Sequence, residues 1–287
     1  MIKKLVSPLL PKREKNANKG AFGTLTVVGG SEKYRGAPIL ACEAALRSGV
    51  GICRLCSTEK VVASAAMRRP EIVFQPIEET EKGAISSKSF ILNLKGILKS
   101  SAILVGIGMT ECFDTEATVT ALISNYEGRL IIDADGLNSI KTCPEKLISA
   151  KKTPIITPHV GEMARLTKLS ISEIKESRER VALDFAKKYN CVVVLKDSVT
   201  VIASPEGRSI TLDRENSALA KGGSGDVLSG IIASLSAQGL APYDAALCGA
   251  VIHSEAGLAA SSVMAEESVL PSDIIACLSA VFKELRS

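Results

Sequence analysis

The sequence predicts an α/β fold with a doubly wound, mainly parallel central sheet and helices on both faces. Short apolar runs alternate with helical segments along the 287 residues, as in chains built from strand–helix units. The runs are apolar throughout, which is typical of strands covered on both faces. No long linker or repeat divides the chain, so residues 1–287 are expected to form one domain, with residues 1–18 as an N-terminal extension.

The expected strands are short and mostly end at glycine or acidic residues. They cover residues 23–28, 51–56, 102–105, 129–133, 154–157 and 191–196, and a hairpin covers 200–203 and 209–212. Pro205, Glu206 and Gly207 supply the residue types of the hairpin turn.

The expected helices cover residues 38–47, 170–189, 226–237, 242–260 and 271–285. Pro38 suits the first turn of the first of these helices, and Gly49 suits its C-terminal end. Ser170 and Glu173 have the spacing of a capping box. A charged amphipathic helix is expected to continue from there to about Tyr189.

Composition excludes several classes of partner. The net charge of +4 is spread along the chain, and aromatic residues make up only 3% with no Trp. Nucleic acid is therefore not expected as a partner, because basic clusters and stacking platforms are lacking. No apolar run reaches the roughly 18 residues of a membrane span, and residues 1–20 lack the apolar core of a secretory signal. A cytoplasmic protein that binds no membrane is expected.

Eight cysteines raise the question of disulfides or metal. In a chain of this length without a secretory signal, reduced thiols are expected. Cys53 and Cys56 form one C-x-x-C pair, but no second pair or suitably spaced histidine accompanies them. We interpret them as small buried residues of a strand.

Polar or glycine-rich turns follow the predicted strands. They are Gly29–Gly30, Gly106–Gly108, Asp133–Asp135, His159–Glu162 and Lys196–Asp197. In doubly wound sheets, ligands bind outside the carboxyl ends of the strands. Turns are expected at that edge in any such fold, but acids, a histidine and a lysine are not. The pattern predicts a functional site there.

The segment Gly222–Asp226 is the strongest chemical motif. Its glycines let backbone N–H groups converge on a phosphate, and the following helix contributes positive potential at its N-terminus. Asp226 at the helix start is either a simple partner of the helix dipole or a base for a substrate hydroxyl that attacks a phosphoryl group. The chain contains no Walker A sequence and no dinucleotide fingerprint.

The residues alone leave the roles of four further groups undecided. Lys196 is either a phosphate-binding charge or a solvated strand end. His159 is either a ligand contact or a structural residue, and by itself the segment favours the latter. Glu162 is a candidate to hold Mg²⁺ through water. Asp133 and Asp135 indicate metal or acid–base work, or an ordinary helix-start turn.

Taken together, the motifs resemble the ADP/ATP-dependent NAD(P)H-hydrate dehydratase family of the ribokinase-like superfamily. The resemblance runs from about Lys19 to Ala260. The matching segments are Gly20–Ser31, Tyr34–Pro38, Gly106–Met109, Ile132–Asn138, Thr157–Glu162, Val194–Ile202 and Asn216–Asp226. The resemblance implies a ribokinase-like fold and a role in metabolite repair.

The implied reaction restores NADH or NADPH from its hydrate, NADHX or NADPHX. The hydrate hydroxyl is phosphorylated by ADP or ATP, ADP being favoured, and phosphate is then expelled. The family also implies Mg²⁺, a homotetramer and, as functional partner, a separate NAD(P)H-hydrate epimerase. The alternative is a kinase of the same superfamily acting on hydroxyethylthiazole or hydroxymethylpyrimidine. A non-catalytic nucleotide sensor is disfavoured because Asp226 and the motif glycines are all present.

The resemblance also implies site residues. Asp226 matches the catalytic acid that faces the hydrate hydroxyl. The implied hydrate contacts are Ala37, Gly108, His159 and Asp226. The implied nucleotide contacts are Lys196, Asp197, Ser198, Val199, Thr200, Gly222, Gly223 and Gly225. Glu162 matches the acid used near Mg²⁺ in related kinases. The chain departs from the family pattern at Ile107, Val160, Asp197 and Ser217, and Asp197 replaces the glycine usual in the nucleotide loop.

Overall fold

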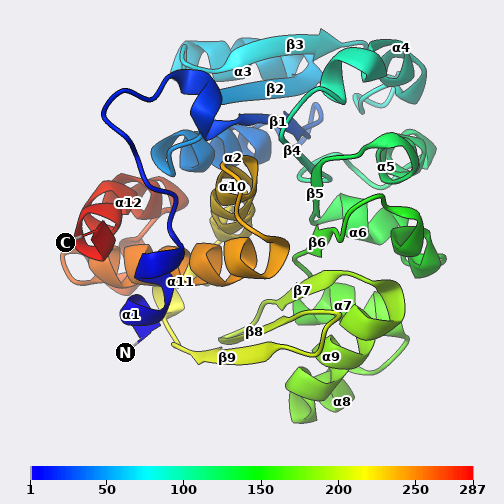
Figure 1. Ribbon diagram of the computed structural model, residues 1–287. Helices are drawn as coiled ribbons and strands as arrows, with labels where there is room; N and C mark the ends of the chain where they lie inside the picture. The colour runs from blue at the N-terminus through cyan, green and yellow to red at the C-terminus, as the bar shows by residue number, and fades with distance from the viewer. Residues whose placement is uncertain (1, 287) are drawn as a thin grey trace.

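A computed structural model describes residues 2–286. The strands are β1 (Thr24–Val28), β2 (Ile52–Thr58), β3 (Val73–Ile77), β4 (Ala102–Val105), β5 (Arg129–Ile132), β6 (Ile155–Ile156), β7 (Val192–Leu195), β8 (Val199–Ala203) and β9 (Ser209–Asp213). They form one sheet in the order β3-β2-β1-β4-β5-β6-β7-β8-β9 (Figure 1). In this order, all neighbouring strands from β3 to β7, including β2 and β1, pair in parallel. β8 and β9 add antiparallel strands at the edge next to β7. The predicted fold class is confirmed.

Helices cover both faces of this sheet. They are α1 (Ile2–Val6), α2 (Gly36–Arg47), α3 (Glu59–Arg68), α4 (Ser87–Ile97), α5 (Phe113–Asn125), α6 (Asp135–Ser139), α7 (Val160–Thr167), α8 (Ile171–Glu176), α9 (Arg178–Tyr189), α10 (Ser224–Ala237), α11 (Pro242–Ser261) and α12 (Pro271–Arg286). Short 3-10 helices lie at Ser7–Leu9, Lys19–Phe22, Pro144–Ser149, Ser217–Leu219 and Glu266–Ser268.

Two hydrophobic cores lie on opposite faces of the sheet. Alternate strand residues point to opposite faces, so Val27 joins the core beneath α2, α10, α11 and α12, while Val28 joins the core beneath α5, α7 and α9. Figure 1 shows these two groups of helices on either side of the strands. Both faces are buried, which explains why the strands read as continuous apolar runs.

The expected single helix over residues 170–189 is wrong. The chain breaks at Ser177 (φ −136°, ψ 40°) into α8 and α9. The Ser177 N–H bonds to the Ile174 carbonyl three residues back, and its own carbonyl accepts from Val181 to start α9. α8 packs against α7, whereas α9 packs against β7 and β8. Helical periodicity continues across such a break, so only the packing reveals it.

Strand β3 was not anticipated from the sequence. It lies at the edge of the sheet, is largely exposed and contains Pro76, so it has no apolar run. An edge strand tolerates proline because one side of its backbone faces no partner. The apolar-run criterion finds buried strands and therefore overlooks this one.

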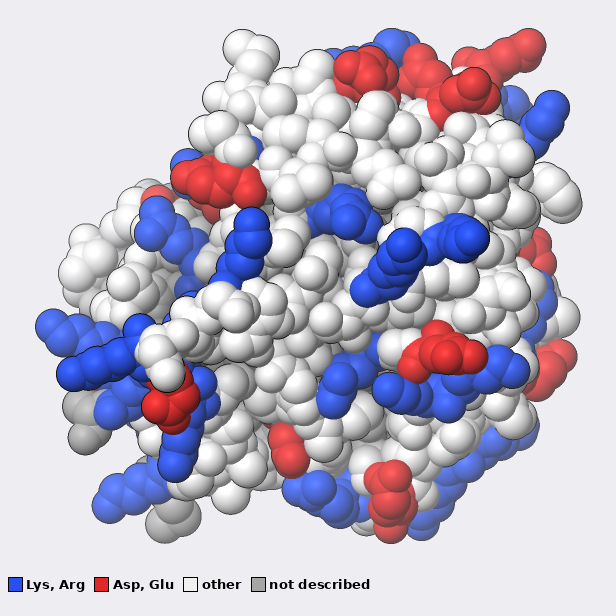
Figure 2. Space-filling model, turned by 45° about the horizontal axis from the view of Figure 1, so that its top comes forward, with Lys and Arg blue, Asp and Glu red and all other residues white. Residues whose placement is uncertain are grey.

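The surface and the cysteines agree with the composition. On the face seen in Figure 2, Lys and Arg side chains are scattered among Asp and Glu side chains. All eight cysteines are unpaired, and Cys53 and Cys56 are buried in β2. Within residues 2–286, no helix is both long and apolar enough to cross a membrane.

Candidate functional site

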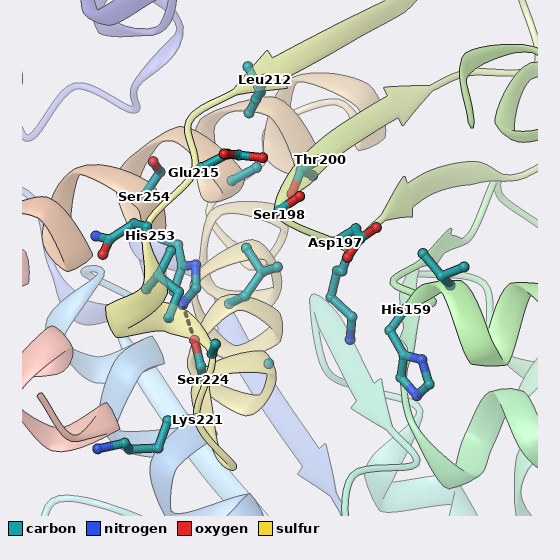
Figure 3. A pocket seen from close by; sticks show the side chains of 18 of the residues that line it. His159, Asp197, Ser198, Thr200, Leu212, Glu215, Lys221, Ser224, His253 and Ser254 are labelled. Atoms are coloured by element: carbon teal, nitrogen blue, oxygen red, sulfur yellow. Dashed lines mark hydrogen bonds between the residues drawn. The ribbon is translucent and has the colours of Figure 1, made fainter. Parts of the chain in front are cut away.

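A cavity of about 980 Å³ opens at the carboxyl ends of β5 to β7 and at the start of α10 (Figure 3). Most of the residues expected at the site line it. These are His159, Glu162, Lys196, Asp197, Ser198, Thr200, Gly222, Gly223, Gly225 and Asp226. Val199 instead lines a second hollow beside α8 and α9. Segments that are far apart in the sequence thus form one wall, as the position of the turns predicts.

Ala37 and Gly108 lie together but do not line this cavity. Gly108 has a positive φ of 60°, and a Cβ placed on it would lie 3.1 Å from the Ala37 Cβ and 2.9 Å from the Tyr34 Cβ. A larger residue at position 108 would therefore be crowded as well as strained. Close packing against Tyr34 and Ala37 explains the glycine here.

The glycine turn presents free backbone donors at the start of α10. Gly223 has φ +100°, a conformation that favours glycine. The Ser224 N–H bonds to the Lys221 carbonyl. Within residues 2–286, the N–H groups of Gly225 and Asp226 donate to no acceptor. Free N–H groups at a helix N-terminus bind an anion such as phosphate.

The carboxyl of Asp226 titrates near neutral pH. Burial, together with the negative charge of Asp133, raises the pKa of its carboxyl to about 7, and the positive charge of Lys196 partly offsets this. Its carboxylate has no hydrogen-bond partner in the described part of the chain. An unpaired carboxyl with a pKa near the working pH suits a general base.

Lys196 is held by a buried carboxylate. Its Nζ lies 2.9 Å from Oδ1 of Asp133, whose other oxygen accepts from the Ser229 hydroxyl in α10. Burial lowers the pKa of Lys196, but Asp133 and Glu162 outweigh it, so its pKa is raised and it stays charged. The structure therefore excludes the solvated strand end. A Cβ placed on Gly225 would lie 3.5 Å from this Nζ, so the charge sits beside the glycine turn.

His159 and Glu162 form a capping box at the start of α7. Nδ1 of His159 accepts from the Gly161 and Glu162 N–H groups, and Glu162 accepts from the His159 N–H at 2.8 Å. Burial lowers the pKa of His159 and raises that of Glu162 to about 7. The structural role of His159 is thus real, and its imidazole still borders the cavity.

Asp133 and Asp135 point to different partners. Asp133 binds Lys196, whereas Asp135 begins α6 and accepts from the Thr110 N–H at 2.9 Å. In residues 2–286, no three His, Cys, Asp or Glu side chains are grouped to hold a metal ion. The helix-start interpretation holds for Asp135.

Asp197 is tied to the helices beside the cavity. Its carboxylate lies 2.7 Å from Arg178 in α9 and 3.9 Å from Lys175 in α8. Burial would raise its pKa, but Arg178 and the other basic partners outweigh this, so the pKa is lowered. Asp197 is thus an ion-paired side chain on the cavity wall.

Several cavity residues were missed from the sequence, among them Arg214 and His253. Arg214 ion-pairs with the buried Glu255 of α11. His253 lies in α11, and its Nε2 is 3.1 Å from the Ser224 hydroxyl. The available signal was a single imidazole within an apolar helix. That signal does not reveal which face of the helix meets α10.

Comparisons with known proteins agree with this geometry. Residues 25–279 match the family model of NAD(P)H-hydrate dehydratase. The bifunctional NAD(P)H-hydrate repair enzyme Nnr of Thermofilum pendens is 35% identical over 277 residues, which cover 96% of this chain and 53% of that protein. The ADP-dependent (S)-NAD(P)H-hydrate dehydratase of Neisseria meningitidis is 32% identical, over 92% of this chain and 84% of that protein. The chain spans about half the length of the bifunctional relatives it matches.

Solved structures give the same grouping. The ADP/ATP-dependent NAD(P)H-hydrate dehydratase of Bacillus subtilis, co-crystallised with ATP and Mg²⁺, is 27% identical with a TM-score of 0.82, covering 99% of this chain and 97% of that one. A hydroxyethylthiazole kinase of Pyrococcus horikoshii is 13% identical, over 99% of this chain and 91% of that one, with a TM-score of 0.60, and shares the fold alone. The chain belongs to the NAD(P)H-hydrate dehydratase family.

Proposed function

We propose that this protein restores NADH and NADPH from their hydrates in a reaction that consumes ADP or ATP. The observation that carries the proposal is the position of Asp226, a carboxyl with a pKa of about 7 next to free N–H groups at the start of α10. The names of the Neisseria and Bacillus relatives support the choice of substrates.

The residues divide the work between base and anion stabilisation. Asp226 takes the proton of the hydrate hydroxyl as that oxygen attacks the terminal phosphorus, and the bond to the bridging oxygen of the nucleotide breaks. The N–H groups of Gly225 and Asp226, with the Lys196 ammonium, stabilise the charge on the moving phosphoryl group. Phosphate then leaves with the hydrate oxygen, a ring proton is lost, and the double bond of the reduced nicotinamide is restored.

We propose that Glu162 contributes to binding Mg²⁺ through water. Mg²⁺ in nucleotide sites is commonly held by one or two carboxylates together with phosphates and water. Glu162 lines the cavity and is the kind of single carboxylate that such a site needs. Mg²⁺ bound there would neutralise polyphosphate charge. His159, Ala37 and Gly108 are proposed to contact the hydrate.

The proposed function also bears on the partner enzyme, the assembly and the location of the protein. The name of the Neisseria relative specifies the (S) hydrate. A site selective for one epimer needs a separate epimerase activity to supply it from the other. We propose such an epimerase as functional partner, a homotetramer as the assembled form, and the cytoplasm as the location.

The deciding experiment follows absorbance at 340 nm, a property of the reduced nicotinamide, with purified hydrate. Absorbance should rise only when ADP or ATP is present, and comparison of the two nucleotides gives the preference. A hydroxyethylthiazole and a hydroxymethylpyrimidine, assayed in parallel for phosphorylation, should not react. Restoration without nucleotide would overturn the proposal, as would preferred phosphorylation of either vitamin precursor.

A further inference from the structure

His253 is a buried histidine of α11 that faces the first residue of α10. Its Nε2 lies 3.1 Å from the Ser224 hydroxyl, and the two residues are 7% and 4% exposed. Figure 3 shows this contact at the cavity, next to the glycine turn. Burial lowers the pKa of His253 to about 4. The imidazole is therefore neutral, and its Nε2 either donates an N–H to the Ser224 hydroxyl oxygen or accepts the hydroxyl proton, depending on the tautomer.

The contact is a polar pair in a largely apolar interface. The facing surfaces of α10 and α11 otherwise bury small and aliphatic side chains, with Gly249 packed directly on Ile232. A buried polar pair has to recover the cost of leaving water, so it contributes little more stability than well-packed apolar groups. The hydrogen bond instead fixes the relative position of the two side chains, because it holds two atoms at one distance and angle.

The contact fixes a segment that has little stiffness of its own. Gly222 and Gly223 precede Ser224, and glycine leaves the backbone more conformations than any other residue. Immediately after Ser224 come the free N–H groups of Gly225 and Asp226 and the Asp226 carboxyl. A shift of Ser224 would therefore move every group of this turn that the reaction uses.

We propose that His253 is a positioning residue. It holds Ser224 in place and thereby orients the first turn of α10 toward the phosphoryl group during its transfer. This inference rests on the proposed function, because it assigns the effect to phosphoryl transfer. A transition state is more sensitive than a bound ground state to small displacements of its donors. The anchor is thus expected to act on kcat more than on nucleotide binding.

The test replaces each partner in turn. His253→Phe fills a similar volume but makes no hydrogen bond, and Ser224→Ala removes the other partner. Each should lower kcat on the order of 10- to 100-fold, while the KM for ADP or ATP changes by less than about threefold. The double variant should be no slower than the slower single variant, because one contact is lost in each case. His253→Gln, which retains a side-chain N–H, should recover part of kcat.

A matched control lies at the other end of the same helix. The Ser234 hydroxyl in α10 is buried and donates to the Ala45 carbonyl at 2.9 Å, away from the cavity. Ser234→Ala should lower Tm but leave kcat unchanged. Normal kcat in His253→Phe, or a loss of kcat that simply follows Tm across all the variants, would overturn the inference.

A second readout separates this inference from the proposed function. If the wild-type protein restored no NAD(P)H, the proposed function would fail, and the positioning role would be judged on amide hydrogen exchange. His253→Phe should then speed exchange at least several-fold at Ser224 and Val227, whose N–H groups bond to the carbonyls of Lys221 and Gly223, whereas Ser234→Ala should not. Unchanged exchange at these two amides would count against the anchor whatever the activity.

Discussion

Lys196 at the end of β7 and Asp133 at the end of β5 form a buried ion pair, with 2.9 Å between Nζ and Oδ1. β5 and β7 lie on either side of β6, so the ion pair connects these two strands across the carboxyl end of the short strand β6. Ser229 of α10 donates to the same carboxylate. The charge that borders the glycine turn is therefore held by two strands and one helix.

Lys196→Met should destabilise the protein by about 3–5 kcal/mol, because it leaves the Asp133 carboxylate buried without its partner. Urea unfolding at pH 7 measures this, and adding Asp133→Asn should recover most of the loss. The KM for nucleotide should rise more than about tenfold, because a phosphate-binding charge is removed. Lys175 lines the same cavity but is exposed. Lys175→Met should cost less than about 1 kcal/mol, and equal stability of the two Met variants would contradict the prediction.

Asp226→Asn should stop turnover and leave nucleotide binding intact. The change removes a base but almost no volume, so we expect kcat to fall at least about 100-fold. The Kd for ADP or ATP, measured by calorimetry, should stay within about threefold of wild type. Near-normal turnover in this variant would exclude Asp226 as the base, and a parallel loss of binding would show that its role is structural.

The same substitution should stabilise the fold at alkaline pH. The pKa of Asp226 rises from 3.8 in the unfolded chain to about 7 in the fold, so its ionised form opposes folding. The penalty is absent below pH 3.8, grows between pH 3.8 and 7, and is complete above pH 7. A tenfold change in proton affinity corresponds to about 1.4 kcal/mol. Asp226→Asn should therefore gain up to roughly 4 kcal/mol of unfolding free energy at about pH 8.

Unfolding free energies at about pH 4 and pH 8 test that prediction, since the gain should vanish at the lower pH. Glu162 also has a raised pKa, so the comparison has to be between Asp226→Asn and wild type at each pH. Asp184 is a carboxylate on the outer side of α9 and serves as control. A gain of the same size in Asp184→Asn, or one that does not depend on pH, would refute the assignment.

Asp197→Gly should be tolerated, although it changes the nucleotide loop. The ion pairs of Asp197 with Arg178 and Lys175 are partly exposed, and such pairs contribute about 0–1 kcal/mol. Removing a negative charge from the cavity wall should lower the KM for ADP, and the effect should shrink as salt is added. Asp197→Asn separates charge from backbone freedom, and an unchanged KM in both variants would show that Asp197 does not influence the nucleotide.

The sequence by itself determined the architecture and the edge of the sheet at which the cavity lies. Continuous apolar strands require a sheet covered on both faces, and the carboxyl ends of parallel strands meet at one edge. These two rules brought Asp133, His159 and Lys196 to one place without any tertiary information, and the glycine motif with the family resemblance added Asp226. They hold because they follow from backbone geometry and from burial of whole segments.

Only the tertiary structure decided what surrounds each of these groups. Whether Lys196 is solvated depends on Asp133, which lies 63 positions away in the chain. The role of His253 depends on which face of α11 meets α10, and helical periodicity cannot show that when nearly the whole helix is buried. Side-chain partners and raised or lowered pKa values arise from contacts between distant segments, and such contacts exist only in the folded chain.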